Sequence, residues 1–424
     1  MRVTWKHSAA RGERGMREKR LAVFAVVAVL ICAAVLPRPA LSAEGNIIAY
    51  PSTSAPVLLR PGDYFEAGLE CGSAARITRV SLRPGAGTGA QPVLVSKAFD
   101  CREHKRLTLA APVDAPVGLY DFCVERKKGE GAETVCRGHA VSVVQEFKPA
   151  FRFVVLTDFH VGDERGGKNN PGIPLQELRA KAMAAVNAAR PDFVLLTGDL
   201  VYYPTTYEAD YAQALREVLD GLKVPAFIVP GNHDLYAMMG LGIDGRTFWA
   251  EAFGPRRSAF TYGPFRFIGF NTYNWPPAYS DRLDAALIDA VGSRSLGIMG
   301  RGEFEWVKQQ LEEARGMNLR PVLFAHHDPM NMSAFAGDDK FPVIQRDEFA
   351  KFVRAQGVEY YFFGHTHKNY TREDGDTLYI STGTASSSYL PGEAWSIRIV
   401  DVDAAGNLTM RPFVVWTPLV SAGQ

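Results

Sequence analysis

The sequence predicts a small all-β sandwich domain over residues 44–147, followed by an α/β domain over residues 148–424. The chain of 424 residues is long enough to bury two cores. In the first region short strand-like runs are separated by Gly/Pro turns, the pattern of an all-β domain. In the second region strand-like and helical runs alternate, which favours an α/β sheet. With 47% hydrophobic and 22% charged residues, the composition is that of a globular protein.

The N-terminal residues 1–43 are predicted to be a secretory signal peptide. Residues 21–36, LAVFAVVAVLICAAVL, are sixteen uncharged residues that follow a basic segment and precede the small residues of 40–43. The apolar run is shorter than the roughly 20 residues of a transmembrane helix. We therefore expect a secreted or periplasmic protein without a membrane span after cleavage, although an uncleaved anchor stays open as an alternative.

The charge of the remaining chain gives no reason to expect a nucleic-acid partner. Residues 1–43 carry eight of the 47 Lys/Arg residues and two of the 46 Asp/Glu residues. The part after residue 43 therefore has 39 basic and 44 acidic residues, a formal net charge of −5. Nucleic-acid binding usually needs a basic surface, so we expect a small-molecule partner instead.

Four cysteines follow the signal, and all of them lie before residue 150: Cys71, Cys101, Cys123 and Cys136. An even number in an exported module predicts two disulfides. Three pairings are possible, and we favour Cys71–Cys101 with Cys123–Cys136. The second pair flanks the polar run ERKKGEGAE, which is typical of a hairpin tip. A zinc site made from the four cysteines is disfavoured because no C-x-x-C spacing is present.

The strands of the first domain are indicated by alternation. Phe65, Ala67, Leu69 and Cys71 alternate with polar or small residues, as in a strand with one buried face. The stretch APVGLYDFCV resembles a strand entry of immunoglobulin-like domains. A structural or spacing role is the simplest interpretation of this domain, and binding of a carbohydrate or another partner is the alternative.

The α/β domain is predicted to contain helices at 174–189, 205–221 and 346–355, and an amphipathic helix at EFEWVKQQLEEA. Strands are predicted at FRFVVLT, DFVLLT, PAFIV, FRFIGF, PVLFA and EYYFF. The last three strands, TLYIST, SIRIVDV and LTMRPFVVW, are interpreted as antiparallel additions.

Polar side chains follow five of these strands at the point where each strand ends. The groups are Asp158-Phe159-His160, Gly198-Asp199, Gly231-Asn232-His233-Asp234, His326-His327 and Gly364-His365-Thr366-His367. All six histidines after residue 148 belong to these groups. Because function gathers at the carboxyl ends of strands in an α/β sheet, we expect one site.

The residue types predict a metal centre. Imidazole and carboxylate ligands suit Zn, Mn, Fe and Co. The set is too large for one tetrahedral ion but fits two ions that share an aspartate, an arrangement that supports in-line displacement at phosphorus by a hydroxide. The glycines before Asp199, Asn232 and His365 fit sharp turns that bring backbone close to the metals.

The five groups in this order resemble the calcineurin-like metallophosphoesterases, a family that includes purple acid phosphatases, cyclic-nucleotide phosphodiesterases and glycerophosphodiesterases. The resemblance covers about residues 150–385. It implies a four-layer α-β-β-α sandwich, with two mixed sheets between outer helices. It also implies two divalent or trivalent transition-metal ions, such as Mn, Fe or Zn.

The resemblance assigns roles residue by residue. One metal would take Asp158, His160, Asp199 and His367, and the other would take Asp199, Asn232, His326 and His365, with Asp199 as the bridge. His233 would donate to the phosphate or to the leaving oxygen, and Asp234 would orient His233. His327 would support the site or contact substrate, although it is also an alternative to His326 as the ligand.

The loop at residues 162–168 has the G-x-x-x-x-G-K spacing of a nucleotide-binding loop. Asn169 replaces the Ser/Thr that should reach Mg²⁺, and Pro171 interrupts the helix that should follow. We therefore reject a nucleotide-binding loop. Arg165 and Lys168 are candidates to contact a substrate phosphate, and a solvated loop is the alternative for both.

The function expected from the sequence is that of an exported binuclear phosphoesterase. It would hydrolyse phosphomonoesters or phosphodiesters by attack of a metal-bridging hydroxide. Two alternatives stay open: a non-catalytic, metal-stabilised binding protein on the same fold, and an envelope-binding module that carries a phosphatase. The sequence leaves the substrate, the metal and the oligomeric state open.

Overall fold

The computed structural model describes residues 46–85, 93–165, 173–277, 279–281, 295–335, 337, 339–386 and 394–417. The predicted signal peptide and Lys168 lie outside the described residues. Within these ranges, none of the helices combines the length and the apolar character that crossing a membrane requires.

The N-terminal region is all-β, as predicted. Its strands are β1 (Ile48–Tyr50), β2 (Val57–Leu59), β3 (Tyr64–Pro84), β4 (Val93–Ser96), β5 (Phe99–Ala110), β6 (Gly118–Lys128) and β7 (Gly131–Val143). They form one seven-stranded sheet. The sheet is continuous because the long strand β3 pairs with β5 over residues 64–77 and with β6 over residues 77–84.

Both predicted disulfides are present. Cys71–Cys101 joins β3 to β5, and Cys123–Cys136 joins β6 to β7, where the two residues are direct partners in the antiparallel register. The alternation in β3 is also confirmed, because Phe65, Ala67, Leu69 and Cys71 are all buried. In contrast, Leu94 of β4 is 49% exposed, so this apolar strand is not part of the core.

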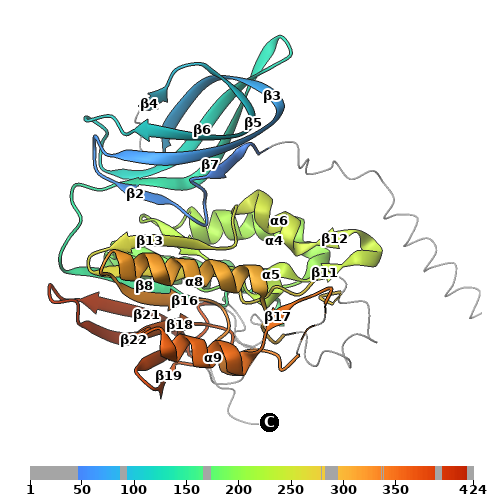
Figure 1. The fold of residues 1–424 in the computed structure, drawn as a ribbon, viewed down its shortest axis with the longest axis vertical. Helices are drawn as coiled ribbons and strands as arrows, with labels where there is room; N and C mark the ends of the chain where they lie inside the picture. Colours follow the sequence, from blue (N-terminus) through green and yellow to red (C-terminus); the bar gives the residue numbers. More distant parts are fainter. Residues whose placement is uncertain are drawn as a thin grey trace, which may run out of the picture. The chain divides into compact units, whose positions relative to one another are not determined.

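The α/β domain contains two large sheets (Figure 1). The five-stranded sheet has the order β10 (Ala226–Ile228), β9 (Phe193–Leu196), β8 (Phe151–Leu156), β21 (Trp395–Val402) and β22 (Leu408–Trp416). The six-stranded sheet has the order β13 (Ser258–Tyr262), β14 (Phe265–Gly269), β16 (Arg320–Phe324), β18 (Tyr360–Phe363), β20 (Thr377–Ser381) and β19 (Tyr370–Asp374).

The direction of one late strand was predicted wrongly. β21 and β22 are antiparallel additions, as expected, but β20 lies parallel to β18. The intervening strand β19 pairs with β20 in the antiparallel sense, so the chain turns back once before β20 joins β18. An alternating apolar pattern predicts a strand but carries no information on its direction.

Helices cover the outer face of each sheet, which confirms the four-layer sandwich. α3 (Leu175–Ala189), α4 (Tyr207–Ala214), its π-helical continuation η2 (Leu215–Leu219) and α6 (Gly245–Ala252) share a core with the five-stranded sheet. α8 (Arg301–Gly316) and α9 (Arg346–Ala355) share another core with the six-stranded sheet, and Figure 1 shows α8 lying across it.

The short elements of the connections are η1 (Pro204–Thr206), α5 (Asn232–Leu235), β11 (Ala237–Met238), η3 (Met239–Leu241), β12 (Ile243–Asp244), β15 (Met299–Gly300), η4 (Pro329–Asn331) and β17 (Val343–Ile344).

The central strands are apolar throughout because both of their faces are buried. In β8, Phe153 and Val155 point into the core between the two sheets, whereas Val154 and Leu156 pack against the helical layer that contains α3. This explains why these strands read as continuous apolar runs. It also fixes the carboxyl ends of the strands rigidly, which positions the residues that follow them.

The N-terminal β region contacts the α/β domain through backbone atoms and one buried arginine. Residues 46–424 form one compact unit. The guanidinium of Arg137 on β7 donates to the carbonyls of Ile48, Ala250 and Glu251, the last at 2.6 Å. Two of these carbonyls belong to the last turn of α6, so Arg137 caps that helix. In addition, the N–H of Ile228 in β10 donates to the carbonyl of Ser54 at 2.9 Å.

Replacing Arg137 with alanine is expected to lower the free energy of unfolding by about 1.5–3 kcal/mol, because three carbonyls would lose a charged donor. Thermal and urea unfolding of the variant would measure the loss. Arg76→Ala is the matched control, since Arg76 is an exposed arginine that pairs with Asp100. We expect it to change stability by less than about 0.5 kcal/mol. Equal stability of both variants would contradict this role for Arg137.

Candidate metal centre

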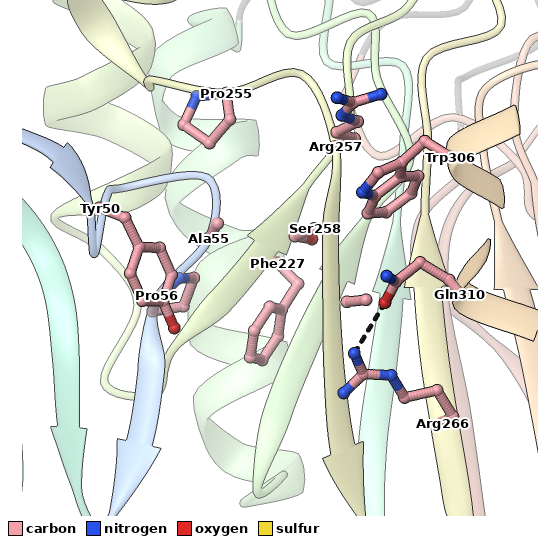
Figure 2. A pocket seen from close by; sticks show the side chains of 11 residues that line it. Tyr50, Ala55, Pro56, Phe227, Pro255, Arg257, Ser258, Arg266, Trp306 and Gln310 are labelled. Carbon is pink, nitrogen blue, oxygen red and sulfur yellow. Dashed lines mark hydrogen bonds between the residues drawn. The ribbon is translucent and has the colours of Figure 1, made fainter. Parts of the chain in front are cut away.

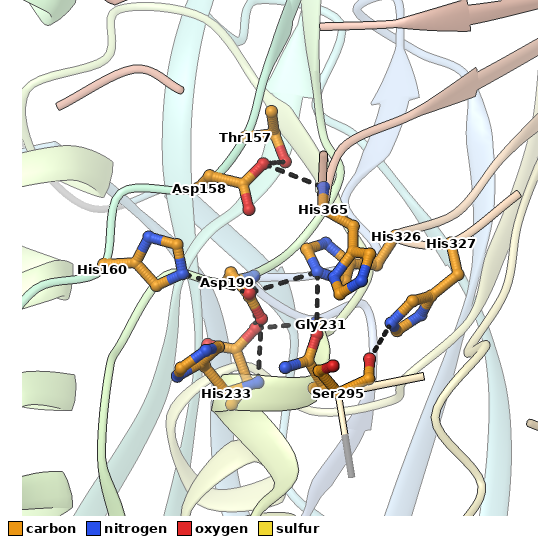
Figure 3. A network of polar contacts seen from close by, with 12 residues as sticks. Thr157, Asp158, His160, Asp199, Gly231, His233, Ser295, His326, His327 and His365 are labelled. Carbon is orange, nitrogen blue, oxygen red and sulfur yellow. Dashed lines mark hydrogen bonds and ion pairs between the residues drawn. The ribbon is translucent and has the colours of Figure 1, made fainter. Parts of the chain in front are cut away.

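The polar groups identified in the sequence lie together at one end of the two sheets. Asp158, Asp199 and Asn232 follow β8, β9 and β10 of the five-stranded sheet. His326 follows β16, and the pair His365 and His367 follows β18, both in the six-stranded sheet. Figure 3 shows Asp158 and Asp199 of one sheet converging with His326 and His365 of the other. Strands that are far apart in the sequence therefore contribute to a single site, as the sequence predicts.

The turns that carry these residues have an unusual backbone conformation. Among the described residues, nine non-glycine residues have a positive φ, and five of them belong to this site: Asp158, His160, Asp199, His365 and His367. Such conformations are costly for side-chain-bearing residues and concentrate at functional sites. Asp158 has φ +55° and His160 has φ +44°.

The last group shows the same feature. β18 ends at Phe363, and both His365 and His367 adopt the left-handed conformation, so the strand geometry does not continue beyond Gly364. They address different neighbours, because the His367 ring lies by Asp158 whereas the His365 ring lies 5.2 Å from that of His326, measured between centroids.

Two glycines allow the turns to approach each other closely, as predicted. A Cβ atom on Gly231 would lie 2.1 Å from Oδ1 of Asp199, and one on Gly364 would lie 1.9 Å from Oγ1 of Thr157. Both distances are far below van der Waals contact, so any side chain at either position would displace the turn that carries an acidic residue.

Asp199 lies at the centre of the site. Its Oδ2 is 3.1 Å from Nε2 of His160 and 3.2 Å from Nε2 of His326, so one carboxylate oxygen faces two imidazoles (Figure 3). Its other oxygen, Oδ1, accepts the backbone N–H of His233 at 2.9 Å. Asp199 is almost completely buried. The geometry is that of a carboxylate held in place through one oxygen while the other is shared between two groups.

The first group comprises Asp158, His160 and His367, which offer ligand atoms that all lie within 4.8 Å of one another. Oδ2 of Asp158 accepts from the hydroxyl of Thr157 at 2.7 Å and from the backbone N–H of His365 at 3.1 Å. The buried Oδ1 accepts no hydrogen bond and lies 3.3 Å from Nε2 of His367. A buried carboxylate oxygen without a hydrogen bond is costly, and a bound cation would remove that cost.

The second group comprises His326, Asn232 and His365. Nδ1 of His326 donates to the carbonyl of Thr197 at 2.7 Å, which leaves Nε2 facing Oδ1 of Asn232 at 3.1 Å. The amide nitrogen of Asn232 donates to the hydroxyl of Tyr236 at 2.6 Å, so its oxygen is the atom turned toward the site. In a neutral His326, Nε2 is an acceptor that faces two oxygen acceptors. A cation between them is therefore needed.

Without a metal, a proton takes the place of that cation. Burial lowers the pKa of His326, but the charge and hydrogen bond of Asp199 outweigh burial and raise it to about 9. Burial likewise raises the pKa of Asp158, but the charge of the nearby His367 outweighs burial and brings the pKa to about 2. Imidazolium and carboxylate groups thus stabilise each other, and the residues fit a site for divalent ions.

His233 lies beside the first group rather than within it. Its Nδ1 donates to the carbonyl of Tyr202 at 2.6 Å, and its ring stacks on Tyr202 with centroids 5.0 Å apart. The ring also meets that of His160 edge-on at 4.8 Å. Burial lowers the pKa of His233 to about 4, although the charge of Asp199 opposes the shift. A bound phosphate would add negative charge and favour the protonated form.

The expected partnership between Asp234 and His233 is wrong. The carboxylate of Asp234 accepts the backbone N–H groups of Gly231, Asp199 and Val201, at 2.8, 2.9 and 3.0 Å. It therefore holds the two metal-site turns together. Burial, with the nearby charge of Asp199, raises the pKa of Asp234 to about 7. Asp234, which we expected to orient the His233 imidazole, instead orients the backbone of these turns.

His327 is placed behind the site. Its Nδ1 lies 2.9 Å from the hydroxyl of Thr272, its Nε2 donates to the carbonyl of Ser295 at 2.9 Å, and the residue is completely buried. Both ring nitrogens are therefore occupied. This geometry favours His326 as the ligand and favours a supporting role for His327, one of the two roles expected for it. A substrate contact by His327 stays a prediction.

Arg165 lies near the site but is bound to a neighbour. Its guanidinium forms two hydrogen bonds to the carboxylate of Asp163, at 2.9 and 3.0 Å, and lies over the Tyr202 ring at 4.8 Å. Arg165, Tyr202 and His233 thus form a stack. A contact between Arg165 and substrate stays a prediction, as does that of Lys168, which lies outside the described residues.

Several supporting residues were missed by sequence reasoning. Tyr236 follows Asn232 by four residues, a spacing that brings side chains together on a helix and could have signalled the contact. The carbonyls of Thr197 and Tyr202 have no sequence signature, because every residue carries one. Trp249 and Tyr262, two aromatic residues of the segment between Asp234 and His326, are buried in the core.

The comparisons with known proteins agree with this geometry. A model of the family described as calcineurin-like phosphoesterases matches residues 151–369, which is more than half of the chain. The chain belongs to the calcineurin-like phosphoesterase family. It is therefore a hydrolase of phosphoric esters, and the His/Asp cluster is its candidate metal site, because this family uses divalent metals.

Two sequence relatives and one solved structure are similar to this phosphoesterase. A 3′,5′-cyclic-nucleotide phosphodiesterase of Nostoc sp. is 25% identical over 277 residues, covering 60% of this chain and 89% of the relative. A probable cyclic nucleotide phosphodiesterase of Rhodopseudomonas palustris is 26% identical over 220 residues, covering 51% and 72%. A purple acid phosphatase from yellow lupin seeds shares the fold, with a TM-score of 0.50, 12% identity and coverage of 85% and 71%.

Proposed function

We propose that this phosphoesterase is an exported enzyme with two metal ions that share Asp199. The observation that carries the proposal is the position of Asp199 Oδ2, which lies between the imidazoles of His160 and His326. A single carboxylate oxygen that faces two groups of ligands is what a bridged pair of ions requires.

The proposed ligands divide into two sets. One ion would take Asp158, His160, His367 and Asp199, and the other would take Asn232, His326, His365 and Asp199. When bound, the pair would supply positive charge for the phosphoryl oxygens and a hydroxide as nucleophile at neutral pH. The resemblance to metallophosphoesterases supports the same division.

The chain's own residues would hold this arrangement and act on substrate. Thr197 and Tyr236 orient His326 and Asn232 through hydrogen bonds. Asp234 fixes the turns of Asp199 and Gly231. His233, anchored to Tyr202, would donate from Nε2 to the phosphate or to the leaving oxygen, which stabilises the charge that develops there.

Phosphodiesters are the proposed substrate class. The relatives from Nostoc and Rhodopseudomonas are named as cyclic-nucleotide phosphodiesterases and align over most of their own length. Metal analysis combined with turnover of bis(p-nitrophenyl) phosphate and p-nitrophenyl phosphate tests the proposal. We expect about two ions per chain and faster turnover of the diester. One ion or none after reconstitution with Mn, Zn or Fe would refute the binuclear site. Full metal content without turnover of either ester would favour a binding protein.

Export is proposed from the disulfides, because such bonds persist in oxidising compartments. Mass spectrometry of the unreduced protein, recovered from outside the cytosol, is expected to show the loss of four protons relative to the reduced chain. The same spectrum should place the N-terminus near Ala43 or Glu44. Free thiols at Cys71, Cys101, Cys123 or Cys136 in this fraction would contradict the proposal.

A further inference from the structure

A cavity of about 270 Å³ lies where the N-terminal β region meets the α/β domain (Figure 2). Tyr50 and Pro56 form its wall on the side of the β region. Phe227, Ser258 and Trp306 are among the residues of the α/β domain that line it. None of these residues belongs to the candidate metal centre, so the cavity is a separate feature.

The cavity follows the outer edge of β13. Within the described residues β13 pairs with β14 alone, so its other edge is free of strands. Ser258 shares its face with Phe260 and therefore points between the two sheets, whereas Arg266, next to Phe267, points to the face that α8 covers. Figure 2 shows Arg266 beside Gln310, and Phe227 beside Ser258. The lining therefore reaches around this edge.

Two buried polar atoms in the lining have no hydrogen-bond partner. These are Oγ of Ser258, whose residue is only 7% exposed, and Nε of Arg266. An unpaired hydroxyl or guanidinium N–H in a buried position destabilises a fold by about 1–3 kcal/mol. A ligand that accepts a hydrogen bond from Nε of Arg266 would remove the cost at that atom.

Two guanidiniums line the cavity, and their carboxylate partners lie outside its lining. Arg257 lies 3.7 Å from Glu303, and Arg266 lies 3.4 Å from Glu313. No carboxylate is among the lining residues. A negatively charged ligand in the cavity would therefore meet two cations and no acidic side chain of the lining.

We propose that this cavity binds a small organic carboxylate with a flat apolar body. The carboxylate would accept from the Arg266 guanidinium, because arginine matches the planar geometry of a carboxylate. The apolar body would lie on Pro56, Phe227 and Trp306. The volume suits a ligand of roughly ten non-hydrogen atoms, smaller than the usual contents of drug-sized pockets.

Benzoate is a suitable probe, with benzyl alcohol as its uncharged counterpart. Titration calorimetry with the full chain should show saturable benzoate binding, with a Kd of about 0.1–10 mM, and weaker binding of benzyl alcohol. Arg266→Gln should weaken benzoate binding at least about tenfold. The matched control Arg354→Gln, which removes the arginine of a surface ion pair with Asp374, should leave it unchanged.

Ser258→Ala is a second control within the lining. Ser258 points to the other face of the sheet from Arg266, so the variant should bind benzoate as the wild-type chain does. Its ligand-free form should unfold at the same or a higher temperature, because an unpaired buried hydroxyl is removed. Asp199→Asn distinguishes this cavity from the metal centre and should retain benzoate binding. Absence of saturable binding by the wild-type chain would overturn the proposal. So would binding that survives Arg266→Gln but is lost in Asp199→Asn.

Discussion

Changing Asp199 to asparagine is expected to lower turnover about 10³-fold or more and to weaken both metal sites. The reason is that its Oδ2 faces both His160 and His326, so one substitution removes charge from both groups. A metal pair supplies several kcal/mol of transition-state stabilisation, and each 1.36 kcal/mol corresponds to tenfold in rate. Metal analysis after dialysis and kcat for the diester measure the two effects.

His367→Ala is the informative comparison for that substitution. His367 lies beside Asp158 and His160, the other members of the first group, so the variant should chiefly weaken one ion and retain the other. Asp100→Asn serves as a control, because Asp100 is an exposed aspartate in the β region. Loss of only one ion in Asp199→Asn would show that Asp199 does not bridge the two sites.

Changing His233 to alanine is expected to lower kcat by about 10²–10⁴-fold while metal content stays at the wild-type level. The ring is anchored to the carbonyl of Tyr202 and stacked on its ring, so it is positioned without a metal. The loss should be smaller for a nitrophenyl ester than for an alkyl ester, because nitrophenolate needs little protonation to leave. Kinetics on both esters, together with metal analysis, provide the measurement.

The result for His233→Ala distinguishes a catalytic role of His233 from a role as metal ligand and from no role in catalysis. His104→Ala is the control, since His104 is an exposed histidine on β5 and should affect neither quantity. If His233→Ala loses metal, the residue is a ligand, and our assignment of its turn is wrong. If the variant keeps both metal and full turnover on good and poor leaving groups, His233 has no catalytic role.

The site could be located from the sequence because its residues come shortly after the ends of recognisable strands. Asp158, Asp199 and His326 each follow an apolar strand within three positions, and the carboxyl ends of such strands meet at one edge. The disulfides were also predictable, because Cys123 and Cys136 flank a hairpin tip. In both cases a local pattern contains the information that fixes the contact.

The features that could not be predicted depend on backbone atoms, on backbone conformation or on the direction of a strand in its sheet. The carbonyl of Tyr202 anchors His233, and backbone N–H groups bind Asp234, but no residue type marks either interaction. The left-handed conformation of His365 is imposed by the packing of neighbouring turns, against its intrinsic preference. The parallel placement of β20 depends on which strand it meets after β19, which is a tertiary choice.

The hydrogen bond from Ile228 to Ser54 has a consequence for how this protein avoids self-association. β10 is the outermost strand of its sheet, and the segment around Ser54 covers it. Unprotected outer strands recruit strands from other molecules and lead to aggregation. A chain shortened to begin at residue 148 would retain every proposed metal ligand, but the edge of β10 would lose the segment that covers it. The β region would then be required for solubility even if it binds nothing.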